Sequence, residues 1–234
     1  MFIILAHSRV GGTTLGHLMK AHPDIKGVVF EPFNTKRIKD KPIKSMEQLR
    51  SELAESKKAE CFKVMRYNIL PCVAREWVLS DDLPVISLYR KNFLKGAVSG
   101  FLANSVKAWH KPQLPGNYAI RRYSSMSIKG IKNNMTWKDK SDQRFREILR
   151  DVKQHMEVCY EDFYFKDGWK RLLPKIYQHV GHKPFMNDKI NWLMKSQRVN
   201  NERVYLNIKN IYEIERECGS DKHGWLFNNC PLML

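Results

Sequence analysis

The N-terminal segment constrains the fold most, because a continuous apolar run is followed at once by a glycine turn and a helix. Phe2–Ala6 (FIILA) contains β-branched residues and predicts a strand that is buried on both faces. The turn over residues 8–14 contains two glycines, and residues 13–21 have apolar side chains at helical spacing before Pro23 ends the pattern. Strand, glycine turn and helix together predict a βα unit.

The same alternation continues along the chain. Strands are expected at residues 27–30, 61–67, 84–89 and 156–160, and helices at residues 46–57, 71–79, 95–110 and 169–180. Such alternation favours an α/β fold in which a central parallel sheet is flanked by helices. A length of 234 residues predicts one large domain or at most two small ones, and we expect a single domain over 1–234.

The charge is strongly unbalanced, with 41 Lys and Arg against 24 Asp and Glu, a formal net charge of +17. A surplus of this size predicts an anionic partner, which could be nucleic acid, an acidic membrane face, or a phosphorylated or sulfated ligand. Residues 107–153 carry 12 basic against 4 acidic residues and form a basic, variable insertion. We interpret it either as a solvated surface loop or as a cationic lid over an anionic ligand.

Targeting and metal-binding patterns are weak. Phe2–Ala6 is too short for a membrane helix, which needs about 20 apolar residues, and for the core of a signal peptide. The five cysteines form no CxxC pair, so we expect neither a zinc ribbon nor a disulfide framework. Reduced cysteines are typical of the cytoplasm, which is therefore the expected location. The pair His179 and His182 is interpreted as a helix surface and cap, so no metal site is expected.

The glycine turn has the chemistry of an anion site. Ligands of α/β sheets bind beyond the carboxyl ends of the strands, and a helix N-terminus offers N–H groups and the positive end of its dipole. Two glycines and two threonines occupy that place, and Arg9 adds a full charge. Because His17 and Leu18 follow Gly16 where a nucleoside-triphosphate loop has Lys and Ser or Thr, an ordinary kinase or NTPase is disfavoured.

Four segments, in this order along the chain, resemble the sulfotransferases that use 3′-phosphoadenosine 5′-phosphosulfate (PAPS). They are RVGGTTLGHL with HPDI and FEPF at residues 9–33, PVISLYR with AVS at 84–99, VCYEDF at 158–163, and KSQ at 195–197. The spacing of nine from Arg90 to Ser99 is similar to that of the bacterial trehalose and Nod-factor sulfotransferases, and the first segment is similar to carbohydrate sulfotransferases.

The resemblance implies a P-loop-like nucleotide-binding fold with PAPS as donor, PAP as product and no metal requirement. The residues that it assigns to PAPS binding are Arg9, Val10, Gly11, Gly12, Thr13, Thr14, Arg90, Ser99, Tyr160 and Lys195. A rival alignment places Gly12 to Thr14 on the motif and puts Val10 where the basic residue belongs. Arg198 and Arg203 are further candidates for closing over PAPS.

The resemblance also implies the reaction, which is transfer of a sulfuryl group to an acceptor hydroxyl or amine by in-line displacement. Arg9 would stabilise the transferring group, and Glu31 would take the acceptor proton, with His7 as the alternative base. Lys63 and Arg66 are candidates for contacts with the sulfuryl group or the acceptor.

The partner expected from this resemblance is a small-molecule or glycan acceptor, with glycolipids included, and a homodimer is possible. Nucleic acid is not expected as a partner, although a non-enzymatic polyanion or nucleic-acid binder is the competing class because of the charge and of Arg121 and Arg122. A third class is a family member that binds nucleotide without transferring sulfate, and a fourth is a P-loop kinase.

Overall fold

A computed structural model describes residues 1–33, 42–54, 58–106, 123–196 and 202–227. The chain divides into two compact units, and each is described by itself. The first consists of Met1–Arg90 and Ser141–Met194, and the second of Lys91–Lys140 and Lys195–Leu234.

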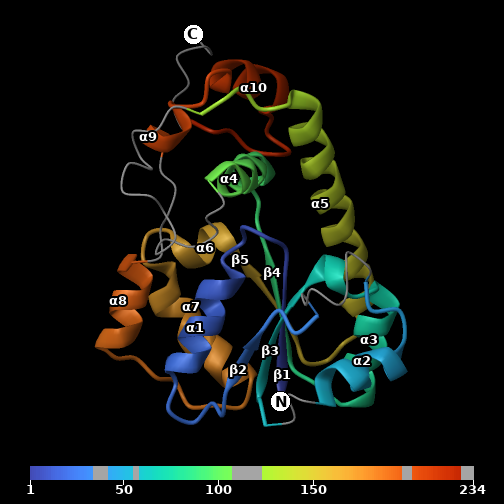
Figure 1. Cartoon of the computed structure of the whole chain (residues 1–234). Helices are drawn as coiled ribbons and strands as arrows, with labels where there is room; N and C mark the ends of the chain where they lie inside the picture. Colours follow the sequence, from blue (N-terminus) through green and yellow to red (C-terminus); the bar gives the residue numbers. More distant parts are fainter. Residues whose placement is uncertain (34–41, 55–57, 107–122, 197–201, 228–234) are drawn as a thin grey trace. The chain divides into compact units, whose positions relative to one another are not determined.

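The first unit is built on a five-stranded sheet (Figure 1). The strands are β1 (Phe2–Ala6), β2 (Val28–Phe30), β3 (Cys61–Met65), β4 (Val85–Tyr89) and β5 (His155–Cys159), in the order β2-β3-β1-β4-β5. Every neighbouring pair is parallel. The α/β class with a central parallel sheet, expected from the sequence, is confirmed.

Helices cover both faces of this sheet (Figure 1). One face packs against α1 (Gly12–Ala21), α7 (Gly168–His179) and α8 (Asp188–Ser196), and the other against α2 (Met46–Leu53), α3 (Pro71–Ser80) and the last turns of α5 (Ile128–Leu149). Because side chains alternate along a strand, Ile4 of β1 faces the first set of helices and Ile3 and Leu5 face the second. β1 is therefore buried on both sides, as its apolar run predicts.

The second unit is helical in the part of the chain that the structure describes. It contains α4 (Phe93–Val106), the first turns of α5, α9 (Glu202–Tyr205) and α10 (Ile211–Cys218). Its apolar cluster includes Leu94 and Val98 of α4, Ile131 of α5 and Ile214 of α10. Whether residues 1–234 form one domain of sulfotransferase type stays a prediction.

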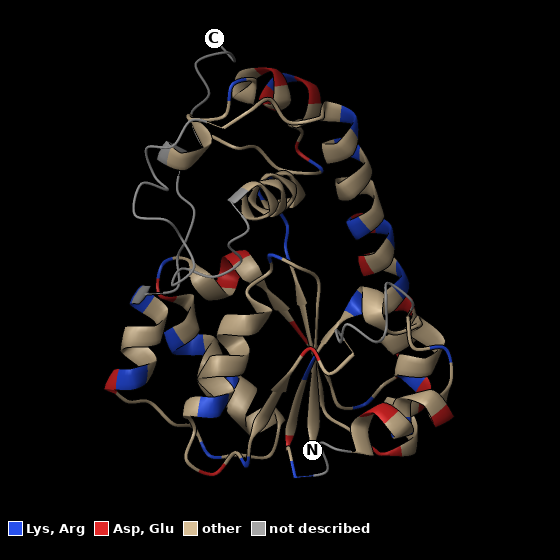
Figure 2. Cartoon of the chain, in the orientation of Figure 1, with Lys and Arg blue, Asp and Glu red and all other residues tan. Residues whose placement is uncertain are grey.

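The basic segment 107–153 differs from the expected loop. Residues 128–149 form the 22-residue helix α5, and Lys and Arg residues recur along its ribbon (Figure 2). The loop interpretation is wrong for these residues because buried side chains at helical spacing (Ile131, Met135, Phe145 and Leu149) give the segment an apolar face. Residues 107–122 lie outside the described residues, so the lid hypothesis stays a prediction.

Two further features bear on the expectations from the sequence. The four described cysteines (Cys61, Cys72, Cys159 and Cys218) are free thiols, while Cys230 lies outside the described residues. Across the described ranges, the helices are all too short or too polar to cross a membrane.

Candidate anion-binding site

The topology of the sheet determines where a ligand site is expected. β2 and β3 lie on one side of β1, whereas β4 and β5 lie on the other. The loops that leave β1 and β4 therefore turn in opposite directions, and open α/β sheets bind ligands in the crevice at such a switch point. The two loops are the glycine turn and the segment that begins at Arg90.

The glycine turn has a left-handed backbone at two positions. Arg9 has φ 66° and Gly11 has φ 82°, and Gly11 is the N-cap of α1. The Leu15 N–H donates to the Gly11 carbonyl at 3.0 Å, which is the first helical hydrogen bond. The N–H groups of the first turn, Gly12 to Thr14, thus have no acceptor within the helix and lie at the positive end of its dipole.

Both glycines of the turn are required by close packing. The Tyr164 hydroxyl donates to the Gly11 carbonyl at 2.7 Å, and a Cβ on Gly11 would lie 2.3 Å from Cε2 of the Tyr164 ring. A Cβ on Gly12 would lie 2.9 Å from Cβ of Ala6 and 3.1 Å from Cε of Lys63. The turn is therefore packed against β1, β3 and the short helix α6 (Tyr160–Tyr164).

Arg90 joins the two loops. It directly follows β4 and is 7% exposed, and its Nη1 donates to the Arg9 carbonyl at 3.0 Å. Its guanidinium carbon lies 4.4 Å from the centroid of the Tyr160 ring, and its Nε lies 3.6 Å from Oε1 of Glu161. The structure thus brings together Arg90, the glycine turn and Tyr160, three parts of the site that the sequence predicted separately.

Glu31 lies at the carboxyl end of β2 and forms an ion pair with Lys63. Lys63 Nζ donates to Glu31 Oε1, and the Glu31 N–H donates to the Lys63 carbonyl at 2.8 Å. The Lys63 side chain is 3% exposed and that of Glu31 is 29% exposed. Burial lowers the pKa of Lys63, and the Glu31 carboxylate opposes that shift. The Lys63 side chain also lies against Gly12, so Lys63 connects Glu31 to the glycine turn.

His7 belongs to a buried charged cluster beside the turn. Its Nε2 lies 3.1 Å from Oδ1 of Asp142, and Arg66 Nη1 donates to the same carboxylate oxygen. Arg66 Nη2 also donates to the Leu88 carbonyl at 3.3 Å. The three side chains of His7, Arg66 and Asp142 are at most 4% exposed. His7 is thus far less accessible to an acceptor than Glu31.

Sequence reasoning missed Asp142 and Tyr164. Asp142 lies on α5, inside the segment interpreted as a basic insertion, where no strand end marked it. Tyr164 lies four residues after Tyr160, and this helical spacing of two tyrosines is the signal that could have pointed to it.

The remaining predicted residues belong either to the glycine turn itself or to the second unit. Val10 and Thr14 are buried and Thr13 is half-buried. Ser99, which is buried on α4, and Lys195, which is exposed on α8, belong to the second unit. Their roles at the nucleotide stay predictions. Arg198 lies outside the described residues.

The fold and the site define a class: an α/β protein with a five-stranded parallel sheet and a glycine turn at its switch point, beside buried arginine and lysine side chains. Among solved structures, that of mouse sulfotransferase SULT7A1 complexed with PAP is similar to this chain, with a TM-score of 0.49 and 17% sequence identity. The match covers 99% of this chain and 73% of the mouse chain. No family model and no curated protein matches the sequence.

Proposed function

We propose that the protein is a sulfotransferase that moves a sulfuryl group from PAPS to a hydroxyl or amine of an acceptor. The observation that best supports the proposal is that Arg90 is hydrogen-bonded to the Arg9 carbonyl at the switch point. Its guanidinium and the glycine turn could therefore bind the same ligand. PAPS carries anionic groups at both its 5′ and its 3′ position. A site with two neighbouring anion-binding elements matches that chemistry better than it matches a ligand with one anionic end.

The two elements would have different tasks. The first N–H groups of α1, with Arg9, Thr13 and Thr14, would bind the 5′-phosphosulfate and stabilise the negative charge that develops on the leaving phosphate oxygen. Arg90 would bind the 3′-phosphate, and the ring of Tyr160 beneath its guanidinium would hold it in place. As in phosphoryl transfer, the protein mainly positions the reactants in line and supplies charge.

The acceptor must lose a proton, and Glu31 is the proposed base. Its carboxylate is paired with Lys63 at the carboxyl end of β2 and is partly exposed, so that an acceptor can approach it from solvent. The buried Lys63 would also provide positive charge beneath the turn. His7 is the alternative base, but its burial against Asp142 makes it the weaker candidate. The proposed mechanism needs no metal ion.

Two finer parts of the proposal rest on the resemblance of the sequence alone, a glycan or glycolipid as acceptor and a homodimer. A cytoplasmic location is proposed from the cysteine pattern of the sequence. The alternative function, a polyanion or nucleic-acid binder without catalysis, is favoured by the net charge of +17. A nucleotide-binding protein that does not transfer sulfate is the second alternative.

Calorimetry with PAP tests the proposal, with AMP and ATP as controls and no added metal. We expect micromolar binding of PAP and much weaker binding of AMP, because only PAP has the 3′-phosphate for Arg90. A screen of hydroxyl and amine acceptors with PAPS would then separate a transferase from a binder. Equal affinity for PAP and AMP would overturn the proposal, and tight, salt-dependent DNA binding in its place would favour the polyanion binder.

A further inference from the structure

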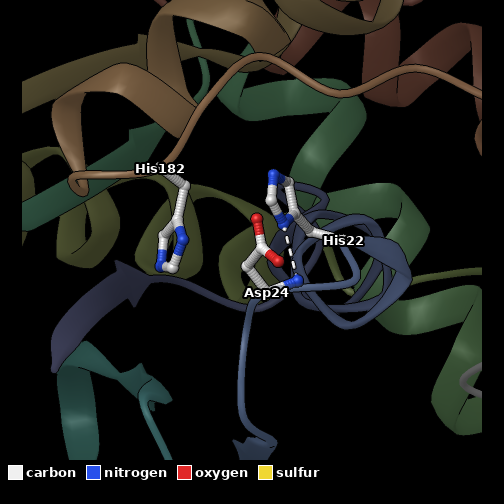
Figure 3. A group of neighbouring side chains, drawn as sticks. All are labelled: His22, Asp24 and His182. Atoms are coloured by element: carbon white, nitrogen blue, oxygen red, sulfur yellow. Dashed lines mark hydrogen bonds between the residues drawn. The ribbon is translucent and has the colours of Figure 1, made fainter.

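Two histidines and an aspartate gather at the end of the first unit away from the glycine turn. His22 follows the last residue of α1, Asp24 lies two residues further on, and His182 lies in the turn after α7 (Figure 3). One ligand atom from each side chain can be chosen so that the three lie within 4.8 Å of one another. We propose that His22, Asp24 and His182 bind a divalent transition-metal ion, with Zn²⁺ as the ion that best suits two imidazoles and a carboxylate.

The hydrogen bonds of the two imidazoles favour this role. His182 Nε2 lies 2.9 Å from Oε1 of Glu60, and His22 Nε2 lies 2.9 Å from the Lys183 carbonyl oxygen. Metal-binding histidines usually donate their second ring N–H to a carboxylate or a carbonyl, which fixes the ring and leaves the other nitrogen as the ligand. Here both acceptors engage Nε2, so Nδ1 is the metal ligand in each ring.

The surroundings hold the rings in place before any ion binds. His22 is 3% exposed, and its ring centroid lies 4.6 Å from that of Tyr177 and 5.2 Å from those of His182 and Phe185. The Asp24 carboxylate, by contrast, is exposed and lies between the two imidazoles in Figure 3. A site with two ordered ligands and one adjustable ligand loses little side-chain freedom when it closes on an ion.

Binding requires one exchange. The Asp24 N–H donates to His22 Nδ1 at 3.1 Å, and a metal bond to that nitrogen replaces this hydrogen bond. Water can take over the Asp24 N–H because the residue is exposed. Tetrahedral zinc ligands lie about 3.3 Å apart at bond lengths of about 2.0 Å. The three atoms must therefore approach one another, and the exposed Asp24 side chain is the part that can move.

The site would act on stability and not on sulfuryl transfer. α1 begins at the glycine turn and ends at His22, so the cluster lies at the opposite end of that helix. An ion would join the end of α1, the turn after α7 and, through Glu60, the residue before β3. The inference does not depend on the proposed function, and PAP binding should be the same with and without the ion.

Titration of the full chain with Zn²⁺ by calorimetry, and with Co²⁺ by visible absorption, tests the site. The exposed thiol of Cys72 is first replaced by C72S, because it could bind either ion. We expect one equivalent of Zn²⁺, the strong d–d absorption of four-coordinate Co²⁺, and a melting temperature that rises with Zn²⁺ concentration.

The variants D24N and H182Q should each weaken Zn²⁺ binding at least tenfold, because each loses a ligand, while the new amide in H182Q can still donate to Glu60. The matched control is H179Q, three residues earlier, whose ring bonds the Val85 carbonyl at 3.2 Å and not the cluster. Circular dichroism checks that each variant is folded. Absence of Zn²⁺ binding by the C72S protein, or equal affinity in C72S, D24N and H182Q, would overturn the proposal.

Discussion

The Arg90 guanidinium donates a hydrogen bond from Nη1 to the main-chain carbonyl of Arg9 at 3.0 Å, across 81 positions of sequence. This bond links the end of β4 to the turn after β1, where the strand order reverses. Arg90 thereby restrains the left-handed backbone at Arg9 and remains beside the N-terminus of α1. One buried side chain thus connects the two loops from which the proposed PAPS site is built.

Replacing Arg90 by alanine should weaken PAP binding by about 10- to 100-fold, since hydrogen bonds to charged groups contribute about 1.5–3 kcal/mol. Arg90→Lys keeps the charge but loses the planar guanidinium, so its affinity for PAP should lie between those of the wild-type protein and Arg90→Ala. Calorimetry measures both variants, and circular dichroism verifies that they fold. Unchanged affinity in Arg90→Ala would remove this residue from the nucleotide site.

Glu31→Gln should retain PAP binding and lose sulfuryl transfer, because an amide cannot accept the acceptor proton. The same change breaks the ion pair with Lys63, so a second variant, Lys63→Met, separates loss of the pair from loss of the base. Transfer rates with saturating PAPS and PAP affinities provide the two readouts. Full activity of Glu31→Gln would move the role of the base to His7.

Gly11→Ala should destabilise the fold by more than Gly181→Ala does. Both glycines have a left-handed backbone, with φ 82° and 83°, but a Cβ on Gly181 meets nothing within 4 Å, whereas one on Gly11 meets the Tyr164 ring. The backbone strain should cost about 1 kcal/mol in each, and overpacking should add about 1–3 kcal/mol at Gly11. Urea unfolding of the two variants measures the difference. Equal losses in the free energy of unfolding would contradict this prediction and show that the Tyr164 ring moves aside without cost.

Asp142→Asn should lower the free energy of unfolding by about 3–5 kcal/mol, because it leaves the Arg66 charge buried without its carboxylate. The exposed pair of Arg146 and Glu157, at 2.9 Å, provides the matched control, and Arg146→Gln should cost less than about 1 kcal/mol. Urea denaturation at neutral pH compares them. A loss in Asp142→Asn as small as that in the control would mean that water reaches Arg66.

Alkaline pH should destabilise the protein through its tyrosines. Partial burial and the Glu31 carboxylate raise the pKa of Tyr67 to about 12, and burial raises the pKa of Tyr164 and Tyr177 as well. The folded state therefore holds these protons more tightly than the unfolded chain, whose tyrosine pKa is about 10. This contribution is fully present below pH 10 and is lost as the pH rises toward 12.

Lys63 acts in the opposite direction below about pH 10.5, since burial lowers its pKa, but three tyrosines outweigh one lysine. Urea unfolding at pH 9, 10 and 11 should show a falling free energy of unfolding, with a shallower fall in Tyr67→Phe. Phenolate absorbance follows the titration directly. A constant or rising stability over this range would contradict the assignment.

Local patterns were sufficient for the sheet and the turn. The apolar run at β1 matches its structural bounds of Phe2–Ala6, and the strands and helices expected around β3, β4 and α7 lie within a few residues of their observed ends. Side chains alternate every two residues in a strand and recur about every 3.6 residues in a helix, and Gly or Pro often ends such a pattern. Whether a segment is a strand or a helix can therefore be predicted from residues that are neighbours in the sequence. The helix α5 was not predicted, because the charge of the basic segment concealed its buried face, and α8 and α10 were not predicted either.

The alternation of strands and helices can be predicted from the sequence, and so can the places of Arg9 in the glycine turn and of Glu31 and Arg90 at strand ends. Which of these residues are in contact depends on the tertiary structure. Arg90 meets the Arg9 carbonyl, Glu31 pairs with Lys63, and His7 pairs with Asp142. Such contacts depend on strand order and register, which residues distant in the chain determine through packing, and no local period of the sequence encodes them.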